Sequence, residues 1–326
     1  MNFKIVLVWF VLAFIIGAGS AFGVFVLLSK STNQEVAEVK TVNLNDFAEQ
    51  GGPLPEFDEE VDLIEEPVDP NAGIKKYTVK KGAQFPGTYA KSFIVADLDS
   101  GDIIAAKDKD LILPIASLSK LMTAIVAEET LSRDDKITIS RSAVNTYGKQ
   151  GRLSAGEVYS SQDIFYPLLL ESSNDAAEAI AEYNGRDSFI SDMNAKADSI
   201  GLSFTSFEDP SGLSANNVST ASELFRLTKY IYEFRRYILE LTQLKKYQSD
   251  NKTWYNNSRF RNDKNYLGGK NGYTDEAGKT LVANFQLPLE GENGFRNISI
   301  VLLNSKDTTT DTRRILSFLL ENVYYK

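Results

Sequence analysis

The order of strand and helix patterns is the feature that most restricts what this chain can fold into. Two apolar runs, Ser92–Leu98 and Ile103–Ala106, flank a Gly-containing turn and predict a hairpin near the start of the globular region. Two more strand patterns, Thr280–Phe285 and Asn297–Leu303, come only near the end of the chain. We therefore expect an α+β fold: an antiparallel sheet assembled from distant segments, flanked by helices, with a largely helical lobe inserted, and not a doubly wound βαβ fold.

Helical patterns fill the stretch between these two pairs of strands. An apolar stripe with spacing i, i+3, i+4, i+7, i+8 predicts a buried helix, and its members are Leu118, Leu121, Met122, Ile125 and Val126. Further helices are expected at residues 162–171, 175–183, 188–200 and 221–244, with a closing helix at 312–324.

An apolar stretch without charged residues, Ile5–Leu28, lies near the amino terminus. It is long enough to cross a bilayer of about 30 Å at about 1.5 Å per residue. We expect residues 1–30 to be a transmembrane anchor, with a cleaved signal peptide as the alternative because Gly17–Ala21 offers small residues. The expected location is the cell membrane, as a single-pass protein with its C-terminal bulk on the extracytoplasmic side.

Residues 31–76 are acidic and show no sustained hydrophobic period. Between Glu35 and Pro70 there are twelve Asp or Glu residues and one lysine, a balance of −11 in a chain whose net charge is −9. This composition predicts a disordered linker before a globular domain at 77–326, with an acidic binding arm as the alternative. The rest of the chain carries +2 and has no basic stripe, so nucleic acid is not an expected partner.

The chain contains no histidine and no cysteine. It therefore cannot build a Ser-His-Asp triad, a Cys-His dyad, or a thiolate or imidazole metal site. We expect no metal and no other cofactor. If the chain carries out nucleophilic chemistry, lysine is the best base available to it.

Ser117 and Lys120 lie one helical turn apart where the striped helix begins. Residues three apart on a helix are neighbours, so this hydroxyl and this amine can meet while the stripe anchors the helix. The free N–H groups and the positive dipole end of a first turn favour an oxyanion there. A lysine is a base only when neutral, so the pKa of Lys120 must fall from about 10.4 towards neutrality through burial or a neighbouring cation.

The spacing S-x-x-K is weak when taken alone, because serine near a helix start followed by lysine is common. A second copy, Ser249–Lys252, lies in a polar run without an apolar stripe to form or bury a helix, and we assign it no role. Two later motifs strengthen the first copy. Ser172-Ser173-Asn174 lies at a junction between two helical patterns, and Lys270-Asn271-Gly272 precedes a strand.

With these motifs in this order, the chain resembles the serine D-alanyl-D-alanine carboxypeptidases, the low-molecular-mass penicillin-binding proteins of peptidase family S11, whose signatures run S-x-x-K, S-x-N, K-T-G. The likeness covers roughly residues 77–326. It extends past the motifs to Pro114–Thr123, Leu169–Ala177, Asp209–Leu213, Ser219–Ala221 and Gly269–Gly278. The resemblance implies a β-lactamase/DD-transpeptidase-like fold. It also implies a peptidoglycan stem peptide ending in D-Ala-D-Ala as substrate and β-lactam antibiotics as covalent inhibitors.

The resemblance also implies a role for each motif residue. Ser117 would attack the peptide carbonyl and form an acyl-enzyme, with Lys120 taking the proton. Ser172 and Asn174 would relay protons and hold the substrate amide. Lys270 would bind the terminal carboxylate and help to keep Lys120 neutral, because two ammonium groups in one cleft repel each other.

The third motif completes the implied substrate site with Asn271, Gly272 and Tyr273. The backbone N–H groups of Ser117 and Tyr273 would form the oxyanion hole. Asn271 departs from the family, which usually has threonine there, and its amide would replace a hydroxyl that contacts the substrate carboxylate. Reduced or altered activity is therefore one expectation.

Three functions stay open at this point. The first is a carboxypeptidase, with an endopeptidase that cuts peptide crosslinks sharing the same motifs. A β-lactamase is disfavoured because the chain has no E-x-x-L-N segment to supply a deacylating glutamate. The third function, after the peptidase and the β-lactamase, is that of a membrane-tethered wall-binding homologue with impaired catalysis. The Asn271 substitution motivates it.

Overall fold

The computed structural model describes residues 77–148, 150–249, 252–290 and 294–325. The chain separates into two units, Met1–Pro70 and Asn71–Lys326, and every described residue belongs to the second. The expected anchor at 1–30 and the expected linker at 31–76 lie outside the described residues. Within the described part of the chain, no helix combines the length and the apolar character that a membrane crossing needs.

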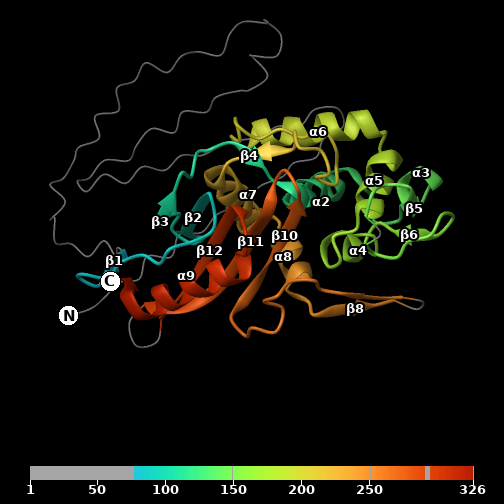
Figure 1. The fold of residues 1–326 in the computed structure, drawn as a ribbon. Helices are drawn as coiled ribbons and strands as arrows, with labels where there is room; N and C mark the ends of the chain where they lie inside the picture. Colours follow the sequence, from blue (N-terminus) through green and yellow to red (C-terminus); the bar gives the residue numbers. More distant parts are fainter. Residues whose placement is uncertain (1–76, 149, 250–251, 291–293, 326) are drawn as a thin grey trace, which may run out of the picture. The chain divides into compact units, whose positions relative to one another are not determined.

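Five strands form the main sheet in the order β10-β11-β12-β2-β3, and every neighbouring pair is antiparallel (Figure 1). They are β2 (Ser92–Asp97), β3 (Ile103–Lys107), β10 (Tyr266–Thr274), β11 (Gly278–Glu290) and β12 (Gly294–Ser305). The early hairpin joins the late strands through β2 and β12, where Val95 pairs with Ile300. The expected antiparallel sheet assembled from distant segments is confirmed.

Side-chain alternation along the strands separates the two faces of the sheet. Phe93 and Leu302 pack in one apolar cluster with helix α9 (Thr308–Asn322). Their neighbours Ile94 and Val301 belong to a second cluster formed with the helical lobe. Because successive residues of a strand point to opposite faces, α9 covers one face and the lobe covers the other. Strand β2 is accordingly buried along its whole length.

The inserted lobe lies between β3 and β10 and is mainly helical. Its helices are the 3₁₀ turn η1 (Ala116–Leu118), α2 (Ser119–Thr130), α3 (Arg141–Val144), α4 (Phe165–Leu169), α5 (Asn174–Tyr183), α6 (Arg186–Ser199), α7 (Ala221–Phe234) and α8 (Arg236–Gln243). The apolar stripe predicted for the first of them is confirmed, since each member is at most 2% exposed.

Short strands pair into small two-stranded antiparallel sheets around these elements. The pairs are β1 (Tyr77–Val79) with β13 (Val323–Tyr325), β4 (Leu113–Pro114) with β7 (Val218–Ser219), β5 (Lys136–Thr138) with β6 (Val158–Ser160), and β8 (Lys246–Gln248) with β9 (Thr253–Tyr255). The last pair occupies the polar run that holds the second S-x-x-K copy. Ser249 follows β8 and Lys252 precedes β9, and the Ser249 N–H donates to the Lys252 carbonyl, so neither residue lies in a helix.

Side-chain caps fix where several helices begin. Ser173 at α5, Thr220 at α7 and Asp307 at α9 each accept a backbone N–H from the first turn. Caps of this kind contribute about 1 kcal/mol each to stability. The Ser173 cap sets the start of α5 within the second sequence motif.

The helix expected at 221–244 is observed as two helices, α7 and α8. Arg235, with φ −138° and ψ 37°, separates them. The break lets both segments bury apolar side chains, Ile231 on α7 and Ile238 on α8. Because the residues on each side keep a helical period, the sequence pattern does not reveal the change of direction.

Candidate active site

Ser117 lies in the 3₁₀ turn η1, directly before α2. Its side chain is partly exposed, while the residues on both sides are buried. Ala116 has φ 50°, a left-handed conformation that costs about 1–3 kcal/mol in a residue other than glycine. The Thr280 hydroxyl holds the turn by donating to the Ile115 carbonyl at 3.0 Å. Strain just before the serine is thus maintained by contacts with the sheet.

Lys120 lies at the start of α2 and is fully buried. Its Nζ is 3.0 Å from Ser117 Oγ and 2.7 Å from Asn174 Oδ1. A third neighbour is the carbonyl oxygen of Ser211, at 2.5 Å. The expected contact between Ser117 and Lys120 is present, and the amine also bridges two other segments of the lobe.

Burial lowers the pKa of Lys120 to about 7, while the carboxylates of Asp209 and Glu178 act in the opposite direction. A large share of the amine is therefore neutral near pH 7. A neutral amine has two N–H groups and one lone pair, whereas the ammonium has three donors and no lone pair. Which groups surround Nζ therefore decides whether it can act as a base.

The neighbours of Nζ assign a direction to each hydrogen bond. The side-chain carbonyl of Asn174 and the backbone carbonyl of Ser211 can only accept, so they take the two N–H groups of neutral Lys120. The amide of Asn174 is held in this orientation because its Nδ2 donates to the Tyr147 carbonyl at 2.7 Å. The lone pair is left for Ser117, whose hydroxyl can donate. This is the arrangement of a general base and its nucleophile.

The second motif brings Ser172 and Asn174 to the same place from the start of α5. Ser172 has φ 64°, again a left-handed conformation outside glycine. Asn174 opens α5 directly after its cap, Ser173, and points its side chain to Lys120. Ser172 instead meets the third motif, since its hydroxyl accepts from Lys270 Nζ at 2.8 Å. One short segment therefore contacts both lysines.

Lys270 lies on β10 and is 2% exposed. Its Nζ donates to Ser172 Oγ and, at 2.7 Å, to the carbonyl of Asn271. Burial, and then the charge of Lys120, hold the pKa of Lys270 well below its usual value. Burial is the largest cause that lowers the pKa of each of these two lysines.

Gly272 lets strand β10 approach Ser117. A Cβ at this position would lie 2.8 Å from Ser117 N and 2.6 Å from Thr280 Oγ1. Any larger residue would push the strand and the turn apart. The backbone nitrogen of Ser117 therefore lies beside Gly272, the residue before Tyr273. An oxyanion hole made by the N–H groups of Ser117 and Tyr273 requires these two segments to lie this close.

Asn271 and Tyr273 occupy the other face of β10. Asn271 pairs with Leu281, which belongs to the cluster under α9, and Tyr273 pairs with Lys279. The Tyr273 side chain is 62% exposed. By strand alternation the side chain of Asn271 faces away from the lobe, and its backbone carbonyl accepts from Lys270 Nζ.

The segment Asp209–Leu213 supports the site in a way that the sequence analysis did not assign. One Asp209 oxygen accepts N–H groups of Ser211 and Gly212, at 2.7 and 2.6 Å, and the other accepts that of Ser214. These bonds lower the pKa of Asp209 although burial raises it. They shape the loop that offers the Ser211 carbonyl to Lys120.

Glycine at position 212 brings this loop against the nucleophile turn. A Cβ there would lie 1.9 Å from the Ala116 carbonyl oxygen, and the backbone has φ 84°. The sequence signal was present, since the D-P-S-G-L segment was part of the resemblance. The sequence could not reveal the role of this loop, because it acts through the backbone carbonyl of Ser211 and through the close contact of Gly212 with Ala116. Neither depends on a pattern of side chains.

Comparisons with known proteins agree with this geometry. A D-alanyl-D-alanine endopeptidase of Escherichia coli (strain K12) is 33% identical over 235 residues, which are 68% of this chain and 74% of that protein. The structure of a D-alanyl-D-alanine carboxypeptidase from Mycobacterium tuberculosis H37Rv is 26% identical, covers 74% of this chain and 95% of that chain, and superposes with a TM-score of 0.65. Penicillin-binding protein D2 from Listeria monocytogenes, in its ampicillin-bound form, is 26% identical with a TM-score of 0.62, over 72% of this chain and 99% of that chain.

The family comparison covers the site itself. Residues 79–306 match the D-alanyl-D-alanine carboxypeptidase family, peptidase S11. This range contains the nucleophile turn, the start of α5 and strand β10. The chain therefore belongs to the S11 family of D-alanyl-D-alanine carboxypeptidases.

Proposed function

We propose that this chain is a penicillin-binding serine carboxypeptidase that removes the terminal D-alanine from peptidoglycan stem peptides through an acyl-enzyme on Ser117. The observation that carries the proposal is the environment of Lys120. Its Nζ lies 3.0 Å from the Ser117 hydroxyl and contacts two carbonyls that can only accept, so the neutral amine keeps its lone pair for that hydroxyl. Ser117 is the partly exposed member of this buried cluster.

Acylation would proceed in two steps. Ser117 Oγ attacks the carbonyl carbon of the D-Ala-D-Ala bond while its proton passes to Lys120 Nζ. The N–H groups of Ser117 and Tyr273 stabilise the resulting oxyanion, each donor contributing about 3–4 kcal/mol. The C–N bond then breaks, the leaving amine takes the proton through Lys120 or Ser172, and an ester remains on Ser117.

Deacylation repeats the same chemistry with water. Lys120 accepts a proton from a water that attacks the ester, and the proton returns to Ser117 Oγ as the shortened peptide leaves. Lys270 would bind the carboxylate of the substrate. That carboxylate supplies the counter-charge that the buried Lys270 lacks, which raises the pKa of Lys270 in the complex.

An endopeptidase that cuts peptide crosslinks is the second candidate. The motifs are the same, and the E. coli relative at 33% identity carries that name. The distinguishing experiment offers the purified protein two substrates, a linear stem pentapeptide and a crosslinked dimer. Free D-alanine from the pentapeptide with little cleavage of the dimer supports the carboxypeptidase, and the reverse preference supports the endopeptidase.

A wall-binding homologue with impaired catalysis is the third candidate, and Asn271 is the residue that motivates it. Because β10 turns the Asn271 side chain away from the lysine cluster, we expect the parent to release D-alanine. Asn271→Thr should then change the rate only modestly. No release from the parent and a large gain in Asn271→Thr would favour the wall-binding role.

The same proposal extends to the organisation of the whole chain. Residues 1–30 would be a membrane anchor, 31–76 an acidic linker, and 77–326 a catalytic domain on the extracytoplasmic side. The apolar stretch Ile5–Leu28 supports this order. The test isolates the protein from membranes and determines its amino terminus. A protein that keeps residues 1–30 and stays in the membrane after carbonate extraction would support the anchor. A mature protein that lacks these residues would show that they are a signal peptide.

A further inference from the structure

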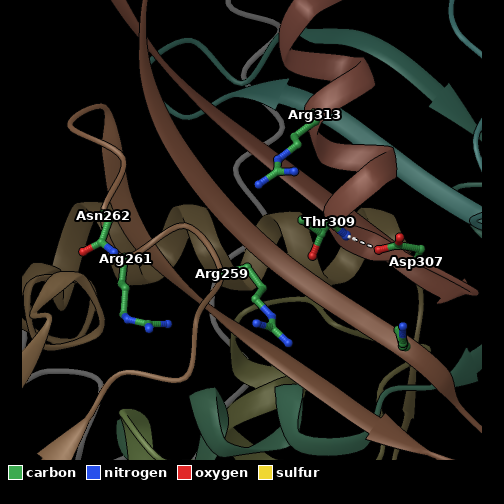
Figure 2. Close-up of a pocket in the computed structure, with 7 residues that line it drawn as sticks. Arg259, Arg261, Asn262, Asp307, Thr309 and Arg313 are labelled. Carbon is green, nitrogen blue, oxygen red and sulfur yellow. Dashed lines mark hydrogen bonds between the residues drawn. The ribbon is translucent and has the colours of Figure 1, made fainter.

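A second polar hollow lies on the α9 face of the sheet. It has a volume of about 540 Å³, and we call it the arginine pocket. Its lining comes from the loop between β9 and β10, from the start of β11, and from the beginning of α9 (Figure 2): Arg259, Arg261, Asn262, Lys279, Asp307, Thr309 and Arg313.

Strand register places the arginine pocket and Ser117 on opposite faces of the sheet. Thr280 on β11 faces the lobe, where it donates to the Ile115 carbonyl. Its neighbour Lys279 therefore faces the α9 side. Lys270 and Gly272 face the lobe on the neighbouring strand. The arginine pocket is thus on the opposite face of the sheet from the nucleophile, and none of the proposed catalytic residues lines it.

Among the residues that the structure describes, the positive charge of the arginine pocket is not balanced by carboxylates. Four cationic side chains line it, Arg259, Arg261, Lys279 and Arg313, against one carboxylate. Within the described residues none of the four forms a salt bridge, whereas Arg235 elsewhere pairs with both Glu128 and Glu129. Like charges gathered without counter-ions repel each other, so an anion would stabilise this arrangement.

The one carboxylate, Asp307, is committed to the start of α9. Its Oδ1 accepts the N–H groups of Thr309 and Thr310, and its Oδ2 accepts the Thr310 hydroxyl at 2.7 Å. These bonds hold the pKa of Asp307 below its usual value, with Lys279 making a smaller contribution. Asp307 therefore serves as a helix cap, and none of the three guanidinium groups has a salt bridge to a carboxylate in the part of the chain that the structure describes.

The cationic side chains come to the arginine pocket from separate segments of the chain. Arg259 and Arg261 reach the arginine pocket from one loop, and Arg313 reaches it from α9 (Figure 2). Arg261 is held in place because its Nη1 donates to the Ser258 carbonyl at 2.9 Å. Guanidinium forks bind the oxygens of carboxylates and phosphates in pairs. Donors that arrive from separate segments can reach several oxygens of one phosphate group.

We propose that the arginine pocket is a binding site for a phosphate group. The neutral polar side chains of Asn262 and Thr309 supply further hydrogen-bonding groups to such a ligand. The same chemistry is offered by a soluble phosphate ester and by a phospholipid headgroup. The site is independent of the hydrolytic reaction, so each can be tested without the other.

The test measures binding of inorganic phosphate to the full-length protein in detergent by isothermal titration calorimetry. We expect one site per chain, and a loss of affinity of at least about tenfold in the double variant Arg259→Ala/Arg313→Ala. Arg259→Lys/Arg313→Lys keeps the charge but removes the forks, and should also weaken binding. The matched control Lys81→Ala/Lys136→Ala removes two exposed cations outside the arginine pocket and should bind like the parent.

Several results would overturn the proposal. They are no binding by the parent, equal affinity in the arginine double variant and the lysine control, or binding of citrate as tight as that of phosphate. Acylation by labelled penicillin separately measures the activity of the site around Ser117. This acylation should persist in Arg259→Ala/Arg313→Ala. Phosphate binding should in turn persist in Ser117→Ala. Competition by glycerol phosphate or by short-chain phosphatidylglycerol then identifies the source of the phosphate.

Discussion

Two regions of the molecule gather cations, and the protein treats them in opposite ways. In the candidate active site, Lys120 and Lys270 are buried and their pKa values are lowered. In the arginine pocket, Arg259 and Arg313 remain exposed. A buried amine gives up its proton and becomes a base, whereas a guanidinium keeps its charge under all ordinary conditions. The difference teaches that side-chain type and burial together decide whether a cluster of cations performs proton transfer or holds an anion.

The largest effect should come from removing the base. Lys120→Met keeps an unbranched side chain in the core but leaves Ser117 without a proton acceptor. We expect the rate of acylation by labelled penicillin to fall by about 10²–10⁴-fold, measured as a second-order rate constant. Lys252→Met, at the lysine of the second S-x-x-K copy, is the control and should acylate like the parent. Near-parental acylation in Lys120→Met would refute the assignment of the base.

The pH dependence of acylation tests the protonation state of the same amine. Only neutral Lys120 offers a lone pair, and its pKa is about 7. The acylation rate should therefore be level above this value and fall about tenfold for each pH unit below it. Stopped-flow labelling between pH 5 and 9 measures the profile. A rate that stays constant down to pH 5 would show that the amine is not the base.

A smaller loss is expected when strand β10 is pushed away from the nucleophile. Gly272→Ala places a methyl group 2.8 Å from Ser117 N, so the turn and the strand must separate and the oxyanion hole widens. We expect acylation to slow by about 10–100-fold, less than the loss of a well-placed oxyanion donor. Gly87→Ala is the control, because nothing lies within 4 Å of its Cβ. Parental acylation rates in both variants would show that the close approach of Gly272 to Ser117 is not needed for acylation.

The smallest effect concerns the loop that presents the Ser211 carbonyl. The charge of Asp209 raises the pKa of Lys120, so Asp209→Asn should move the acid limb of the acylation profile to lower pH. The amide also loses one acceptor oxygen, and the plateau rate should drop by a few-fold, about 1 kcal/mol in barrier. A purely structural role would lower the plateau without moving the limb.

The fold could be anticipated wherever local pattern and burial agree. The hairpin β2–β3 and the stripe from Leu118 to Val126 follow from period alone, and both are observed. The separation of α7 from α8 at Arg235 could not be foreseen, since it depends on how each helix packs and not on its own period. The pairing of β2 with β12 does not follow from local pattern. It was expected because strands occur at both ends of the domain, which favours one sheet assembled from distant segments.

The site was predictable to the extent that side chains carry it. Ser117 and Lys120 meet as their spacing suggested. The roles of Asn174 and Ser172 were implied only by the family resemblance, and these residues contact Lys120 and Lys270. Contributions made by the backbone were not visible in the sequence, above all the Ser211 carbonyl that orients the amine. The arginine pocket could not be predicted from the sequence, because its cations come from three segments that only the folded sheet and α9 bring together.

The pairing of Ser117 with a neutral Lys120 is tested most directly by locating the acyl group. The full-length protein is incubated with a labelled penicillin, and the adduct is mapped by peptide mass spectrometry. The structure predicts a single modified residue, Ser117, and no labelling of Ser117→Ala, while Ser249→Ala labels like the parent. An adduct on any other residue, undiminished labelling of Ser117→Ala, or none at saturating drug would contradict the account.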